Sequence, residues 1–115
     1  MATKTYEIDA TGQALGRIAT HIATLLRGKN LASFEPNIQP DVKVVLKNID
    51  KMKFTGTKLS SVVRHRHSGY PGGIYSRTLG KEWAKQPKEV VRKAVYRMLP
   101  TNRMRDKIIN NLEIQ

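Results

Sequence analysis

The chain has 115 residues, which is enough for one domain with a core and too few for two of ordinary size. Its 21 Lys and Arg exceed its 9 Asp and Glu by 12 charges, more than solubility requires, so we expect a polyanionic partner, nucleic acid first. The lack of cysteine excludes disulfides, thiolate zinc sites and cysteine nucleophiles, and no apolar run approaches the about 20 residues of a membrane-spanning helix.

The first half of the sequence predicts one β-α-β unit. Met1 to Lys4 lead directly into a strand at residues 6–9, without the features of a signal or transit peptide, so cytoplasm is the default. A turn at 9–12 precedes the clearest helix, whose apolar residues recur at helical spacing from Leu15 to Leu26 and end before Gly28. Residues 30–41 predict a loop, and the nearly continuous apolar run 42–46 predicts a strand of a parallel sheet.

Shorter elements follow a turn at residues 48–50. Residues 52–54 and 62–67 are strand candidates separated by 55–58, and Thr78 is placed to cap a short helix through Trp83. Pro87 is placed to begin a longer helix that Pro100 stops. We expect its apolar face to contain Val90, Val91, Ala94, Val95, Met98 and Leu99. A last helix from about residue 102 would bury Met104, Ile108 and Leu112. The whole predicts a single α/β domain, residues 1–115, with a helical C-terminal third.

Positive charge is concentrated in the second half. Residues 58–115 hold 13 basic and 4 acidic side chains (+9), against 8 and 5 (+3) in residues 1–57. On the longer helix, Lys88, Arg92, Lys93 and Arg97 lie away from the apolar face and Glu89 is the only acid, whereas an ordinary solvated face mixes both signs. Arg103, Arg105 and Lys107 continue this basic surface, and Asn102 is free to cap the last helix.

The segment Gly69-Tyr70-Pro71-Gly72-Gly73 is the most informative loop. Arg64, Arg66 and His67 precede it, and Tyr75 and Arg77 follow it. Cations and aromatic rings around a glycine turn can hold folded RNA through phosphates, 2′-hydroxyls and stacked bases. A solvated hairpin turn is the alternative interpretation.

Two other patterns resemble a nucleotide-binding loop and a metal or catalytic site, but each lacks residues that such a site requires. The turn Gly12 to Gly16 has neither the dinucleotide fingerprint nor the ending of a phosphate loop. His65 and His67 would share one face of a strand, but the flanking arginines repel a divalent cation and no orienting partner for catalysis is evident. We therefore predict no cofactor, no metal and no small-molecule substrate, and favour hydrogen bonds from these histidines to RNA or to the chain's own turn.

The motifs together resemble a known family. Ile8-Asp9-Ala10, Leu15-Gly16-Arg17 and Leu25-Leu26-Arg27-Gly28-Lys29 resemble the opening strand and helix of the bacterial form of the universal large-subunit ribosomal protein numbered thirteen. His67 to Gly73 resembles the glycine loop of that family, and Met98-Leu99-Pro100-Thr101-Asn102-Arg103 resembles its Met-Leu-Pro-x-Asn-Arg turn. The resemblance runs nearly from end to end.

This resemblance implies a three-layer α/β/α domain with a small, largely parallel sheet and no enzyme activity. It implies a partner in large-subunit ribosomal RNA and neighbouring ribosomal proteins, no membrane partner, and a role early in assembly in the cytoplasm. The alternatives are a free RNA-binding regulator and a small RNA-processing enzyme using His65 and His67. The predicted RNA-binding residues are Lys58, Arg64, Arg66, His67, Tyr70, Gly72, Gly73, Tyr75, Arg77, Lys81, Arg92, Arg97, Asn102, Arg103, Arg105 and Lys107.

Overall fold

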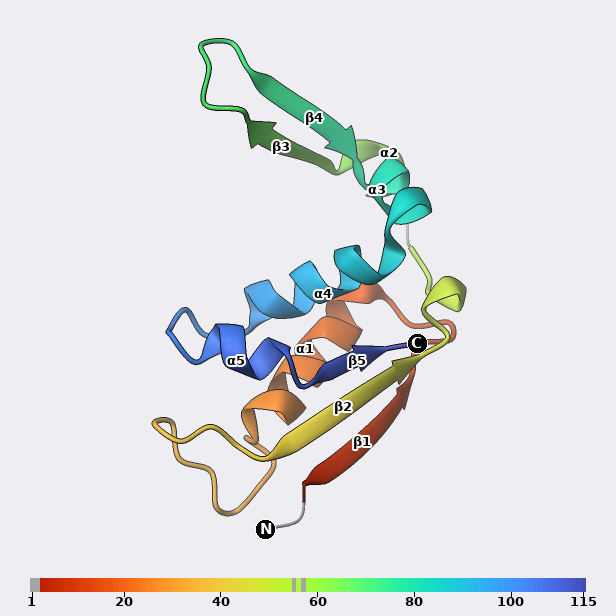
Figure 1. Cartoon of the computed structure of the whole chain (residues 1–115). Coiled ribbons are helices and arrows are strands. Elements are labelled where there is room, and N and C mark those ends of the chain that lie inside the picture. Colours follow the sequence, from red (N-terminus) through yellow and green to blue (C-terminus); the bar gives the residue numbers. More distant parts are fainter. Residues whose placement is uncertain (1–2, 55, 57) are drawn as a thin grey trace.

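A computed structural model of the chain describes residues 3–54, 56 and 58–115, with the backbone alone at residues 58 and 59. One part is a parallel sheet in the order β1-β2-β5, with three helices over one of its faces (Figure 1). Its strands are β1 (Lys4–Asp9), β2 (Val42–Lys47) and β5 (Leu112–Ile114). Its helices are α1 (Leu15–Arg27), α4 (Pro87–Met98) and α5 (Arg105–Ile109).

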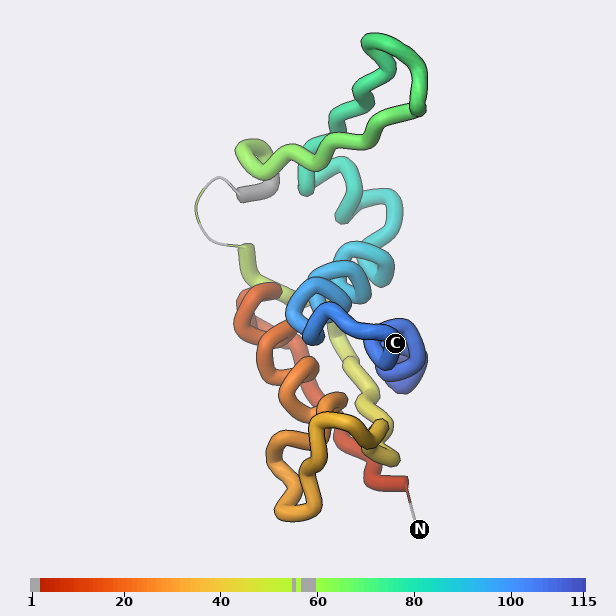
Figure 2. Tube along the Cα trace, turned by 90° about the vertical axis from the view of Figure 1, so that its left-hand side faces the viewer, coloured from red at the N-terminus to blue at the C-terminus, as the bar shows by residue number. Residues whose placement is uncertain are grey.

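The second part is an antiparallel hairpin and the short helices that attach it. The hairpin strands β3 (Val63–His67) and β4 (Ile74–Thr78) are flanked by α2 (Lys58–Ser61) and α3 (Leu79–Lys85), and a single 3₁₀ turn, η1 (Ile49–Lys51), follows β2. Two views at right angles show the hairpin at one end of the molecule, projecting beyond the sheet and α1 (Figures 1 and 2). No helix in the part of the chain that the structure describes is long and apolar enough to cross a membrane.

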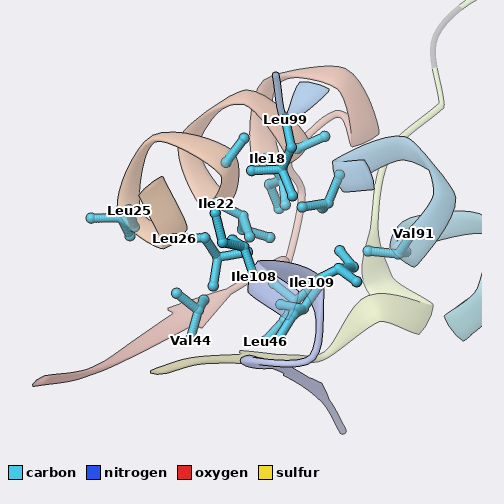
Figure 3. Close-up of a cluster of buried hydrophobic side chains, with 14 of the residues drawn as sticks. Ile18, Ile22, Leu25, Leu26, Val44, Leu46, Val91, Leu99, Ile108 and Ile109 are labelled. Atoms are coloured by element: carbon cyan, nitrogen blue, oxygen red, sulfur yellow. The ribbon is translucent and has the colours of Figure 1, made fainter. Parts of the chain in front are cut away.

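The core lies between the sheet and the three helices. Ile18, Ile22 and Leu26 recur along one face of α1 and are fully buried, because their spacing of four residues keeps them on the side facing the sheet. Figure 3 shows Val44 and Leu46 of β2 pointing toward these side chains, with residues of α4 and α5 closing the cluster. The expected β-α-β unit is therefore confirmed, with β1 and β2 parallel in register.

Glycine and aspartate fix the two connections within this unit, after α1 and after β1. Gly28 ends α1 in the left-handed conformation, with φ 77°, and its N–H donates to the Leu25 carbonyl. A Cβ at Gly28 would lie 2.9 Å from that of Pro40, so this position also needs the missing side chain. At the end of β1, hydrogen bonds from the Thr11 hydroxyl and amide, and from the Asn48 side chain, lower the pKa of Asp9 to about 2.

The opposite face of the sheet is charged and open to solvent. Lys43 pairs with Glu113 across β2 and β5, with 2.8 Å between Nζ and Oε2, and Lys47 pairs with Glu7 across β2 and β1 at 3.2 Å. The hydrogen bond from Lys43 also lowers the pKa of Glu113. These half-exposed ions remain hydrated because the described helices lie over the other face of the sheet (Figure 1). The described residues therefore form two layers rather than the expected three. The α/β class, the small parallel sheet and the helical C-terminal part are confirmed.

The hairpin is joined to the rest of the chain by α3. Thr78 caps this helix as expected, its hydroxyl accepting the Lys81 N–H at 3.4 Å. The Leu79 N–H donates to the Val62 carbonyl at 2.9 Å, which closes the base of the hairpin. Trp83 packs edge-on against Phe54 with ring centroids 4.9 Å apart. These contacts set the direction in which β3 and β4 project.

Several expected details are wrong. Residues 52–54 form no strand, because only Lys53 makes a bridge, to Ala14. Leu112 is buried, but in β5 rather than in the last helix, which ends at Ile109. Met98 is 49% exposed rather than part of the apolar face of α4. The strand β4 was not among the expected elements.

Candidate nucleic-acid interface

The hairpin sorts its side chains onto two chemically different faces. In the antiparallel register, Arg64 lies opposite Arg77 and Arg66 lies opposite Tyr75, so these four side chains share one face. His65 opposite Ser76 and His67 opposite Ile74 form the other. The face with Arg64, Arg66, Tyr75 and Arg77 is called the arginine face here. Like charges in directly opposed positions destabilise a strand pair, so the opposed arginines of this face would destabilise the hairpin on its own. Such an arrangement favours an anionic ligand.

One carboxylate partly compensates the opposed arginines. Glu82 of α3 lies with Oε2 3.4 Å from Nε of Arg64, and both side chains are about one-fifth exposed, at 21% for Arg64 and 19% for Glu82. The Nη1 atom of Arg64 is buried without a hydrogen-bond partner, although buried N–H groups are nearly always paired. Arg77 forms no ion pair with any of the described residues. The guanidinium of Arg64 is thus tethered at one nitrogen and unsatisfied at another.

The arginine face borders a groove between the hairpin and α4. The groove has a volume of about 870 Å³ and is open to solvent. Its lining carries six cations and two carboxylates: Arg64, Arg66, Arg77, Lys85, Lys93 and Arg97 against Glu82 and Glu89. A concave surface lined mostly by one sign of charge concentrates counter-ions, so the groove is a favourable place for a phosphate backbone.

The glycine loop forms the tip of the hairpin. It is held by hydrogen bonds of its own backbone, from Ser68 N–H to the Gly73 carbonyl at 2.8 Å and from Gly73 N–H to the Tyr70 carbonyl at 3.0 Å. Gly72 adopts a φ of 73°, which glycine accommodates without strain. Tyr70 is 76% exposed at the tip. Its ring is therefore available for stacking on a base.

The histidine pair takes part in this local structure. Nδ1 of His65 lies 2.7 Å from the Ser76 hydroxyl, and Nδ1 of His67 accepts the Gly69 N–H at 2.9 Å. Neither bond involves a carboxylate that would orient an imidazole for acid-base chemistry. No group of three or more His, Asp or Glu residues placed to hold a metal occurs among the described residues. The hydrogen bond from the chain's own turn matches the favoured interpretation for His67.

A second basic region lies where α4 turns into α5. The guanidinium of Arg105 stacks on the Tyr96 ring at 3.9 Å, and the Tyr96 hydroxyl donates to Asp106 at 2.8 Å. Asn102 accepts the Arg105 N–H through its side-chain oxygen at 3.1 Å, although the N-cap residue of α5 is Met104 rather than the expected Asn102. Arg92 donates to Asn110 at 3.2 Å. Arg92 and Arg105 therefore tie α4 to the last helix, which sequence reasoning did not anticipate.

The remaining predicted residues fall into two groups by exposure. Exposed are Arg66, His67, Tyr70, Gly72, Tyr75, Arg77, Lys81, Arg97, Asn102, Arg103 and Lys107. Partly buried are Arg64, Gly73, Arg92 and Arg105. The side chain of Lys58 lies outside the described residues. The prediction therefore selected mostly accessible side chains.

Two groove cations, Lys85 and Lys93, are missing from the predicted set. A signal for Lys93 was present, because Glu89, Lys93 and Arg97 follow one another at intervals of four along α4 and so share a face. Lys85 has no comparable signal, since only the turn between α3 and α4 brings it to the groove.

Comparison with known proteins shows the family to which the chain belongs. The family model described as ribosomal protein L13 matches residues 3–115. Large ribosomal subunit protein uL13 of Mycobacterium avium is 45% identical over 109 residues, covering 95% of this chain and 74% of that protein. The protein of the same name from Chloroflexus aggregans is 45% identical, with 95% and 76% covered, and that of Mycobacterium tuberculosis is 44% identical, with 95% and 74% covered. The chain belongs to the ribosomal protein L13 family.

Proposed function

We propose that this chain is a structural constituent of the large ribosomal subunit, that it binds large-subunit ribosomal RNA, and that it contributes to early assembly of the subunit. Membership of the ribosomal protein L13 family, with relatives named as large-subunit proteins, supports this proposal. The observation that carries it is the groove between the hairpin and α4, in which six cations face two carboxylates. We further propose that residues 1–115 act as one domain, in the cytoplasm, beside neighbouring ribosomal proteins.

Binding would proceed by charge neutralisation and by recognition of shape. The groove cations and the exposed Arg103 and Lys107 neutralise phosphates and release their counter-ions. The hairpin tip reaches beyond the body of the protein, where Tyr70 can stack on an unpaired base. None of these contacts requires a chemical step. The role is that of a scaffold that fixes the geometry of folded RNA.

Arg66 offers a direct test of the interface. Its side chain is exposed on the arginine face and makes no hydrogen bond or ion pair with the described residues. Arg66→Ala should therefore weaken binding to purified large-subunit RNA without lowering the melting temperature. Lys43→Ala is the matched control, because it also removes one positive charge but does so from the outer face of the sheet. Equal effects of the two substitutions would refute the placement of the interface.

The salt dependence of binding tests the mechanism. If about six phosphates are neutralised, the logarithm of the binding constant should fall against the logarithm of salt concentration with a slope near −4 to −5. Arg66→Ala should reduce the magnitude of this slope by about one. A wild-type slope near zero would exclude the electrostatic mechanism.

A further inference from the structure

The floor of the groove contains an arginine arrangement that is incomplete in the free protein. Arg64 and Arg77 are directly opposed on β3 and β4, so two positive side chains share one small area of the arginine face. Glu82 engages only Nε of Arg64, while Nη1 is buried and lacks an acceptor. An unsatisfied buried N–H of a charged group is costly. An added anion would relieve both the repulsion and the missing hydrogen bond.

We propose that Arg64 and Arg77 form a clamp for one phosphodiester group of an RNA strand that enters the groove between the hairpin and α4. This proposal rests on the proposed RNA-binding function and assigns its anchoring contact. The planar guanidinium group presents a fork of N–H donors that matches two phosphate oxygens. To contact phosphate, the Arg64 side chain must rotate so that its buried Nη1 reaches the groove that this residue lines.

Glu82 has a specific part in this clamp. In the free protein its carboxylate lies 3.4 Å from the Arg64 side chain and holds that guanidinium at the junction of β3 and α3. In the complex, the same carboxylate repels the phosphate and competes with it for Arg64. Glu82 is therefore a positioning residue that also limits affinity. Lys85 at the end of α3, with Lys93 and Arg97 of α4, leaves the groove positive despite this carboxylate.

Opposite signs of effect distinguish a phosphate clamp from a merely structural ion pair. If the Arg64–Glu82 pair only holds the hairpin in place, Arg64→Lys and Glu82→Gln both loosen it and both weaken RNA binding. If Arg64 binds phosphate, Arg64→Lys removes the fork and weakens binding, whereas Glu82→Gln removes the competing charge and strengthens binding. The amide of Gln retains an oxygen that can still accept from Nε.

The experiment measures the affinity of the full chain for a short oligouridylate by fluorescence anisotropy. We expect Arg64→Lys and Arg77→Ala each to weaken binding about tenfold, the contribution of one charge-assisted hydrogen bond. Glu82→Gln should tighten it about two- to fivefold, the effect of one surface charge pair. A neutral methylphosphonate analogue of the same oligonucleotide should lose the difference between wild type and Arg77→Ala. If Arg64→Lys disturbs the fold, the affinity of Arg77→Ala carries the test, because Arg77 is exposed.

Weaker binding by Glu82→Gln, or unchanged binding by Arg77→Ala, would overturn the clamp. Polyglutamate that competes as well as oligouridylate of equal charge would show a general anion site and would also overturn it. Large-subunit RNA is titrated in parallel with each variant. If wild type binds that RNA and the Arg77→Ala protein binds it equally well, the clamp fails while the proposed function stands. If wild type does not bind it, the proposed function itself fails.

Discussion

Alanine at Gly72 tests whether the shape of the hairpin tip contributes to RNA binding. Gly72 lies in the loop at a φ of 73°, and a Cβ built there meets no atom within 4 Å. Steric overlap with neighbouring residues therefore cannot account for any effect. What remains is the cost of holding an L-residue in the left-handed region, about 1–2 kcal/mol. The loop can avoid this cost by changing its backbone conformation, which would move Tyr70.

Gly16 supplies the matched control. A Cβ there also meets nothing within 4 Å, but Gly16 lies in the first turn of α1 and its φ is not positive. Alanine at this position should stabilise the protein by about 0.5–1 kcal/mol, because glycine is the poorer helix former. The same chemical change is thus expected to have opposite signs at two equally open positions.

Thermal unfolding and RNA binding are measured on both variants. We expect Gly16→Ala to raise the melting temperature with unchanged affinity for large-subunit RNA. Gly72→Ala should weaken binding while lowering the melting temperature only slightly, because no residue of the tip belongs to the hydrophobic core, and Gly72→Val should weaken it further. Full affinity in Gly72→Val would refute the idea that the loop is recognised by its shape.

Three further predictions concern the core, the end of β1 and the histidines. Ile22→Asp should abolish folding, since an unpaired charge would replace a fully buried side chain, whereas circular dichroism should show a folded protein for Ile38→Asp, whose site is 57% exposed. Asp9 has its pKa lowered from 3.8 to about 2, so its contribution to stability should be complete above pH 3.8 and disappear as the pH falls toward 2. Carboxyl NMR titration checks this value, and an ordinary pKa would contradict the hydrogen bonding described. End-labelled RNA should remain intact both with wild type and with the double variant His65→Ala, His67→Ala. Cleavage by wild type that disappears in the double variant would instead support the RNA-processing enzyme.

The helices and strands that the sequence predicts correctly are those whose own residue pattern is sufficient to specify the conformation. Helix α1 combines apolar residues at helical spacing with Gly28 at its end, and α4 begins at Pro87. The strand β2 is a continuous apolar run, which burial in a parallel sheet explains. In each case the local sequence and the tertiary environment favour the same conformation.

The missed strands lack such a pattern for physical reasons. Both faces of β4 are largely exposed, so no alternation of apolar and polar residues marks it, and its pairing with β3 supplies the stabilisation. The three residues of β5 form a strand because the edge of β2 is available to them. Residues 52–54 have strand-like composition but no adjacent strand to pair with. Formation of these strands therefore depends on an available pairing partner rather than on an apolar pattern of their own.

The candidate site was predictable as a set of residues and not as a groove. Charge and glycine patterns indicated the loop and four of the six cations that line the groove. The groove exists because α3 directs the hairpin back over α4, a consequence of contacts such as Phe54 with Trp83. A single sequence also cannot reveal that the Arg105 guanidinium stacks on the Tyr96 ring. The positions of the site residues and their contacts within the protein are set by the tertiary structure alone.

Sedimentation of a cell extract through a sucrose gradient is a direct test of membership of the large ribosomal subunit. At low salt, we expect the protein, followed with an antibody, to be found with the large ribosomal subunit and with whole ribosomes. We also expect it to stay with the large subunit when ribosomes are dissociated into subunits by removal of magnesium. Protein found only at the top of the gradient, separate from the large subunit, would refute the proposed function and favour a free RNA-binding regulator.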